Sequence, residues 1–413
     1  MNTATLAATT AGYAVPPLWR LLTKTGYFLG LSGAIGATVT YAATVRPALR
    51  SARGAASDTA ASGTTASDAI ASDAIAEGTI AEDAAVLRRR SALFLACSGV
   101  ALLVAGYFQL AARVARAGKG MPFGDALAPG AQWDFLRAPA AKGAWIAQGT
   151  VYLVQNALLV ATALALIALL APAARRRTDA IALAALPLSL AVTLVAAVPT
   201  TAPADLDAWL NLLFDQAHIV SGVVWLGGLA LLVALAGTRR RLGEGAGLLW
   251  ADVWRRFGLL AMVCVAAVTV SGLWLSWKHV GGISQLWTTG YGLALLVKLL
   301  LVGGLVAAGA FNQLWLTPRI ARARAADDTA SLLHLTLRHF PRVVWGEVAL
   351  GLAVLLVLPF ISGSARTEAG SPKAVSSATL FTGGAALALA LAASLYATVR
   401  MSDALARRSA ATL

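Results

Sequence analysis

The segment Leu212–Ala236, LLFDQAHIVSGVVWLGGLALLVALA, decides the fold class. A helix needs about 20 predominantly apolar residues to cross the hydrocarbon core of a bilayer, and this segment has 25. Its ionisable side chains are Asp215 and His218, both near the start. The segment therefore predicts a transmembrane helix that carries a polar site near one end.

The composition of the whole chain agrees with a membrane protein. Of the 413 residues, 58% are apolar and 13% are charged, and the mean hydropathy is +0.73. Soluble domains have about 45–50% apolar and about 25% charged residues. The net charge of +14 would indicate nucleic acid binding in a soluble chain, but the basic residues here lie mostly in short loops between apolar segments. We predict an all-α polytopic membrane helix bundle with no nucleic acid partner.

Nine segments are long and apolar enough to span a membrane. They are residues 25–44, 91–112, 145–171, 180–199, 212–236, 257–277, 291–316, 343–363 and 378–399. The loops and tail on one side of these spans hold 22 Lys and Arg residues, and those on the other side hold 10. The positive-inside rule places the richer side in the cytoplasm. The N-terminus is then outside and the C-terminus inside, although the outer loop 113–144 carries five basic residues against this rule.

Five regions follow from this pattern. They are an N-terminal segment with the first span (1–50), a linker (51–90), an N-terminal membrane half (91–204), a four-helix membrane domain (205–363), and a last span with a basic cytoplasmic tail (364–413). The linker repeats ASDAI, ASDAI, AEGTI over residues 66–80 and is rich in Ala, Ser, Thr and Gly. This composition predicts a disordered cytoplasmic segment, because it cannot bury enough apolar surface to offset the entropy of ordering.

A few polar side chains fall inside spans, where ionisable groups are costly and usually face the bundle interior. A helix rise of 1.5 Å per residue places His218, Lys298, Thr269 and Ser271 about 10–12 Å below the outer face. Asp215 lies on the same helix face as His218. These residues predict one polar layer in the outer half of the membrane, with an Asp215–Lys298 pair as the simplest way to satisfy the lysine.

The role of His218 is open at this point. Imidazole is a common ligand of transition metals, and Asp215 could orient it or neutralise the ion. A structural histidine that hydrogen-bonds to Asp215 or to a backbone carbonyl fits the same spacing. Trp225, two turns further along the helix, would line the route below it.

Other candidate ligands have simpler interpretations. Glu347 is expected to form a structural ion pair with Arg342, and Cys97 and Cys264 are expected to act as small apolar side chains. The four methionines form no closely spaced pair, which argues against a thioether pathway for Cu(I). His218 is the single histidine within a predicted span, so a haem held by two histidines is not expected.

The chain from Phe214 to Gly363 resembles the copper resistance protein D family of bacterial inner-membrane proteins. Four groups of residues carry this resemblance, and they occur in the family's order: His218, Trp225, Leu226, Gly227 and Gly228; Phe257, Thr269, Gly272 and Leu273; Thr289, Tyr291, Gly292, Leu295 and Lys298, continuing to Asn312 and Pro318; and Arg342 with Glu347.

The resemblance implies copper handling at the bacterial plasma membrane, with a periplasmic copper-binding protein of the CopC type as a possible partner. We predict a copper permease or delivery protein, not an enzyme. The ion, in an oxidation state that the sequence leaves open, would enter near His279 and Met121 and then meet Asp215 and His218. The alternative is a non-transporting scaffold that helps to metallate a membrane oxidase or a secreted copper enzyme. No Walker A motif that would support ATP-driven pumping occurs in the sequence.

Overall fold

The protein is an all-helical membrane bundle over the part of the chain that the computed structural model describes. The described residues are 16–61, 67–118, 120–238, 241–242, 246–312, 314, 318–319, 322, 340–361, 363–370, 389 and 400. Within them, no strand occurs and seven helices are long and apolar enough to cross a membrane. An eighth, shorter apolar helix covers Val344–Phe360.

Eight of the nine predicted spans therefore have a helical counterpart. The first is continuous over Leu18–Ala52 and includes α2 (Leu18–Leu31), α3 (Ala37–Thr40) and the start of α4 (Arg46–Ala61). The next six lie in α5 (Ser67–Ala117), α7 (Gln148–Ile167), α9 (Thr178–Ala196), α10 (Leu206–Ala236), α11 (Ala246–His279) and α13 (Gly290–Phe311). The eighth is α16 (Phe340–Val357) with the turn that follows it. The ninth predicted span, 378–399, lies almost wholly outside the described residues.

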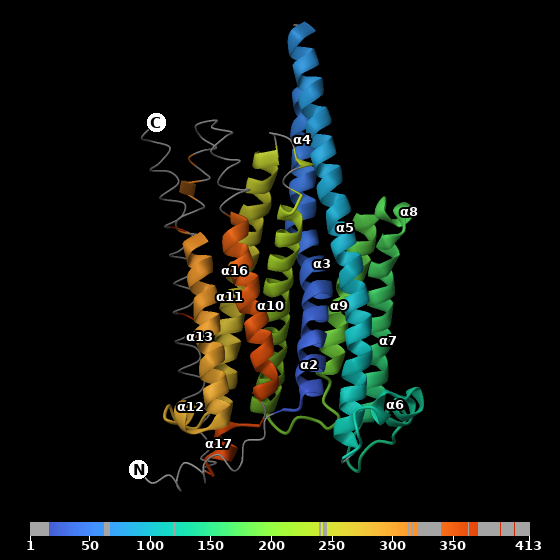
Figure 1. Cartoon of the computed structure of the whole chain (residues 1–413), viewed down its shortest axis with the longest axis vertical. Helices are drawn as coiled ribbons and strands as arrows, with labels where there is room; N and C mark the ends of the chain where they lie inside the picture. The colour runs from blue at the N-terminus through green and yellow to red at the C-terminus, as the bar shows by residue number, and fades with distance from the viewer. Residues whose placement is uncertain are drawn as a thin grey trace.

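The helices form two groups on either side of a central pair. The first span and α10 occupy the centre, α5, α7 and α9 lie on one side, and α11, α13 and α16 lie on the other (Figure 1). The side chains of Val263 and Leu300 on α11 and α13 are 66% and 70% exposed, which suits lipid contact. The bundle core contains the buried residues Tyr41, Trp225 and Trp250, so both the first span and α10 contribute to it.

A glycine contact joins the central pair. A Cβ atom built on Gly36 would lie 2.2 Å from the carbonyl oxygen of Val223, and one built on Gly227 would lie 1.7 Å from that of Ser32. Both contacts are with backbone atoms, so neither could be relieved by moving a side chain. Small residues allow this close approach of helices in a membrane. Gly36 and Gly227 thus serve helix packing.

The predicted loops lie at two opposite ends of the bundle. Figure 1 shows α6 (Pro129–Leu136), α12 (Gln285–Thr288) and α17 (Ala365–Glu368) at one end. These elements belong to the loops predicted to be outside. The loop that contains α8 (Pro172–Arg175) lies at the other end, as the alternation of spans requires.

The structure differs from the predicted disordered linker over 51–90. The backbone is helical over Arg46–Ala61 and again from Ser67, and these two helices project beyond the rest of the bundle (Figure 1). The prediction considered only the burial of this segment. Alanine has the highest helix propensity, and extending a helix that already exists requires no new nucleation. The segment can therefore continue the neighbouring spans without a core of its own.

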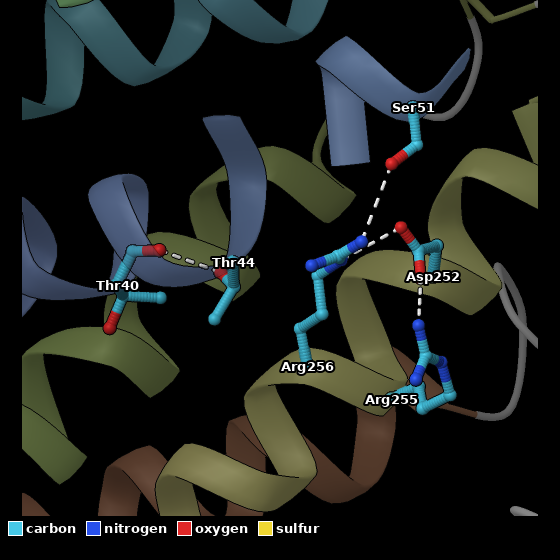
Figure 2. Close-up of polar contacts among 6 residues, drawn as sticks. All are labelled: Thr40, Thr44, Ser51, Asp252, Arg255 and Arg256. Carbon is cyan, nitrogen blue, oxygen red and sulfur yellow. Dashed lines mark hydrogen bonds and ion pairs between the residues drawn. The ribbon is translucent and has the colours of Figure 1, made fainter. Parts of the chain in front are cut away.

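Side-chain contacts fasten the end of the first span to α11. Figure 2 shows Asp252 accepting hydrogen bonds from Arg255 and Arg256, each at 2.8 Å. Arg256 also donates to Oγ of Ser51 at 3.4 Å. In the same view Thr44 donates to the carbonyl oxygen of Thr40 at 2.7 Å, which satisfies this buried hydroxyl within its own helix.

Candidate functional site

His218 lies where three helices meet. It projects from α10 toward α11, and its Nδ1 lies 3.2 Å from the carbonyl oxygen of Val268 and 3.1 Å from Oγ of Ser271. A carbonyl oxygen can only accept a hydrogen bond, so Nδ1 carries the proton in this geometry. Ser271, itself 1% exposed, donates its own proton to the carbonyl oxygen of Ala267 at 2.5 Å. The ring is thus held in one orientation by α11.

The other ring nitrogen faces Lys298. Because Nδ1 is protonated, Nε2 presents a lone pair, and Nζ of Lys298 on α13 lies 3.3 Å from it. The lysine ammonium therefore stands where a metal ion would approach the imidazole. The similar depth predicted for His218 and Lys298 is confirmed by their direct contact.

Asp215 does not form the predicted ion pair with Lys298. The structure shows no ion pair between Asp215 and Lys298, although their charges are close enough to interact. Asp215 lies nearly one turn before His218 on α10. The lysine is satisfied by imidazole, so the predicted pairing with the carboxylate is replaced by one with His218.

An apolar cavity of about 130 Å³ extends from the histidine–lysine pair into the bundle. His218 and Lys298 contribute to its wall, and Trp225 and Gly222 on α10 and Gly351 on α16 line it further along. Trp225 lines this cavity and is 8% exposed. Of the other predicted path residues, Thr269 bonds to the carbonyl oxygen of Val265 in its own helix at 2.7 Å.

The first span supplies part of this cavity, which the sequence did not indicate. Phe28 and Ser32 line it, and the hydroxyl of Ser32 is buried without a hydrogen-bond partner among the described residues. The predicted division placed the first span outside the four-helix domain of 205–363. The glycine pair Gly36 and Gly227 was the available signal, because two glycines in different spans allow close packing.

The predicted outer ligands do not gather around His218. His279 is at the end of α11, where its ring stacks on Tyr291 with centroids 5.9 Å apart and its Nδ1 lies 2.7 Å from the carbonyl oxygen of Leu275. Met121 packs in a separate cluster with Trp19 and Phe123. Among the described residues, no three His, Cys, Asp or Glu side chains lie close enough together to hold a metal ion.

The remaining polar candidates have structural partners or apolar surroundings. Glu347, 3% exposed, accepts a hydrogen bond from Nδ2 of Asn312 at 2.8 Å. The side chain of its predicted partner, Arg342, lies outside the described part of the structure. Cys97 is exposed on α5 and Cys264 is 5% exposed on α11. An ion pair that the sequence reasoning missed joins Lys278 on α11 to Asp207 on α10 at the end that also carries α12.

These features define a class of protein: a multi-pass membrane protein with a histidine–lysine pair at an intramembrane cavity. Residues 251–361 match the family model described as Copper resistance protein D. A relative, the "Copper transport protein CutJ" of Bacillus subtilis (strain 168), is 30% identical over 265 residues. Residues 251–361 are therefore similar to the copper resistance protein D family, and over part of its length the chain is similar to a copper transport protein.

The match to the relative is partial on both sides. It covers 63% of this chain and 43% of the relative, so the chain spans less than half the length of that protein. No solved structure matches the chain. The family model begins in α11, so His218 lies outside the matched residues, whereas Val268, Ser271 and Lys298, which contact it, all lie inside them.

Proposed function

We propose that this protein moves copper ions across the bacterial plasma membrane, for uptake or delivery, and that His218 is the first ligand inside the membrane. The observation that carries the proposal is the position of the His218 imidazole. Its Nε2 lone pair faces Lys298 at an intramembrane cavity, and its other nitrogen is fixed by Val268 and Ser271 of the family region. Copper is the cargo in this proposal, not a resident cofactor.

The residues near the outer end have distinct roles in the proposal. His279 and Asp215 attract the ion toward the membrane, since one offers an imidazole and the other a negative charge. Met121 would contact the incoming ion at the outer end of the bundle, at a separate place from His279. A periplasmic CopC-like protein would deliver the ion to this end, with the N-terminus outside as the distribution of basic residues predicts.

Lys298 controls access to His218 in this proposal. An incoming cation and the lysine ammonium cannot both occupy the space in front of Nε2. Copper binding therefore requires Lys298 to withdraw, and the return of Lys298 expels the ion. Binding and release are then coupled without ATP, Ser271 holds the imidazole in place, and Trp225 and the apolar wall separate the site from the far end. Thr269 and Glu347 stay in this proposal as supports of the surrounding helices.

A scaffold that assists the metallation of another protein is the second candidate. The observation that favours it is the absence, among the described side chains, of a preformed group of three metal ligands. A scaffold would need His218 only for its hydrogen bonds to α11 and α13. The two candidates therefore predict different copper uptake per folded molecule after the imidazole of His218 is replaced.

His218→Gln is the variant that separates them. The glutamine oxygen can still accept a hydrogen bond from Lys298, so the buried ammonium keeps a partner while the imidazole is lost. We expect copper uptake into proteoliposomes to fall by about tenfold or more per inserted molecule, since a tenfold change corresponds to about 1.4 kcal/mol. Cys264→Ala is the control and should leave uptake within about twofold of the wild type, because this thiol is packed among apolar residues.

Two measurements decide the outcome. Uptake per molecule is measured with radioactive copper, and folding is measured by gel filtration and thermal unfolding of the same preparation. Transport that stays intact in His218→Gln would contradict the proposal. Low expression or a lowered thermal midpoint, with normal uptake by the molecules that fold, would favour the scaffold.

A further inference from the structure

A second cavity, of about 320 Å³, lies on the other side of α10 from the histidine–lysine pair. Residues of α2, α5, α7, α9 and α10 line this partly open cavity, and none of the predicted copper-site residues is among them. Its polar wall consists of Lys24, Gln109, Arg113, Arg116, Gln155 and Gln216. Phe28 and Ile219 line both cavities and separate one from the other.

Arg113 is held in place at this cavity by neutral partners. Its guanidinium donates to Oε1 of Gln155 at 2.6 Å and lies over the ring of Tyr152, 4.2 Å from the centroid. Gln155 is 2% exposed and in turn donates to the hydroxyl of Tyr27 at 2.9 Å. The guanidinium is therefore oriented before any ligand arrives, and most of its five N–H groups remain available.

The positive charge of the cavity is not neutralised by its walls. Lys24 donates to the carbonyl oxygen of Leu358 at 2.9 Å, which uses one of its three ammonium protons. Among the described residues, no Asp or Glu lines the cavity or forms an ion pair with Lys24, Arg113 or Arg116. Three cationic side chains around one partly open cavity, one of them the exposed Arg116, favour the binding of an anion.

Two glutamines at this cavity have unused hydrogen-bonding capacity. Gln109 is 8% exposed, and its Oε1, like that of Gln216, has no partner among the described residues. The two ends of a carboxamide are assigned from its hydrogen bonds and not seen directly. In either orientation each amide has a group left for a ligand. A buried polar atom without a partner costs about 1–3 kcal/mol, so a ligand that completes it binds more tightly.

The same arginines oppose the topology rule. Arg113 and Arg116 are two of the five basic residues in the loop predicted to be outside, and Lys24 precedes the predicted first span. Positive charge is otherwise depleted at that end of the spans. The positive-inside rule does not explain basic residues at this end of the spans, whereas a binding site for an anion does.

We infer that this cavity binds a phosphate-bearing anion through Arg113, Lys24 and Arg116. Arginine suits phosphate because its planar fork can donate two parallel hydrogen bonds to the oxygens. The anion has two possible sources, the headgroup of an anionic phospholipid or free phosphate. Lys24 is six residues from the start of α2, about 9 Å along the helix axis, which is within reach of a lipid headgroup. The anion-binding side chains are distinct from the residues of the proposed copper path.

The test uses the full chain purified in an uncharged detergent. Binding is measured by calorimetry with three probes: dihexanoyl phosphatidylglycerol, dihexanoyl phosphatidylcholine and inorganic phosphate. We expect phosphatidylglycerol or phosphate to bind and phosphatidylcholine to bind at least about tenfold more weakly, because its headgroup carries no net negative charge. Binding of phosphatidylglycerol alone identifies a lipid site, and binding of phosphate identifies a soluble anion.

Variants connect the binding to the cavity. Arg113→Gln and Lys24→Gln should each weaken binding by about tenfold or more, the equivalent of about 1.4 kcal/mol. Arg137→Gln is the matched control, because Arg137 is an exposed arginine of the same loop that lies over Trp133 and outside the cavity. Two results would overturn the inference: no binding of either anion by the wild type, or wild-type affinity in both cavity variants. If Arg113→Gln fails to fold, Lys24→Gln decides alone.

Discussion

Replacing Lys298 by methionine tests whether this lysine competes with copper for His218. Nζ lies 3.3 Å from Nε2, and an imidazole nitrogen binds a metal ion such as zinc at about 2 Å. An ion on the line between the two nitrogens would stand about 1.3 Å from the ammonium, which is impossible. Lys298 must therefore withdraw before copper binds, and methionine removes its charge while keeping an unbranched side chain of similar length.

The size of the effect follows from the charge that is removed. If the ammonium withdraws to about 5 Å from a monovalent ion, their repulsion is about 3 kcal/mol at an effective dielectric constant of about 20. Its loss should raise the copper affinity of Lys298→Met by about two orders of magnitude. Uptake should fall at the same time, because the ion is no longer expelled from Nε2.

Copper affinity is measured by equilibrium dialysis against a competing chelator, and uptake is measured in proteoliposomes. Lys278→Met is the control, since it removes a lysine at the end of α11 that pairs with Asp207 and does not contact His218. The reasoning is refuted if Lys298→Met binds copper within about threefold of the wild type, whatever its uptake. Lower affinity would mean that Lys298 supports the ion's site instead of competing for it.

Three further predictions concern packing, topology and the outer end. Gly227→Ala should lower the thermal midpoint by about 1–4 °C, because the new methyl group meets backbone and overpacking costs about 1–3 kcal/mol, whereas Gly222→Ala, with open space around it, should not lower the midpoint. A cysteine at exposed Arg176, in a Cys97→Ala background, should not react with an impermeant maleimide added to intact cells; labelling would reverse the predicted orientation. His279→Ala should reduce copper uptake more at low than at high copper, since this residue concentrates the ion without selecting it, and an equal loss at all concentrations would contradict that role.

The sequence predicted the spans well because each depends on a local property, the length of an apolar run. The depth of His218 and Lys298 followed from the same runs, and their contact is in the structure. Which partner satisfied Lys298 could not be predicted, because Asp215 and His218 lie on one face of α10 within reach of the same space. That choice depends on how α13 is rotated against α10, and side-chain spacing within one helix does not determine it.

Contacts between distant segments were the main omission. Phe28 and Ser32 line the cavity beside His218 although nearly 190 residues separate them in the sequence. The helical segment after residue 66 was missed for another reason, since composition was judged by burial while alanine propensity favoured a helix. The outer arginines were noticed only as exceptions to a topology rule, because their shared cavity is formed by five separate helices.

The backbone contact between Gly36 and Gly227 limits how this membrane bundle can change shape. Where two helices meet through backbone atoms, no flexible side chains lie between them that could rearrange and let the helices slide. We therefore expect the first span and α10 to move together as one rigid unit. His218 belongs to α10 and so to this rigid unit, whereas Ser271 belongs to α11 and Lys298 to α13. In the proposed transport cycle, a change of access to the site would therefore have to come from movement of α11, α13 and α16 relative to the first span and α10.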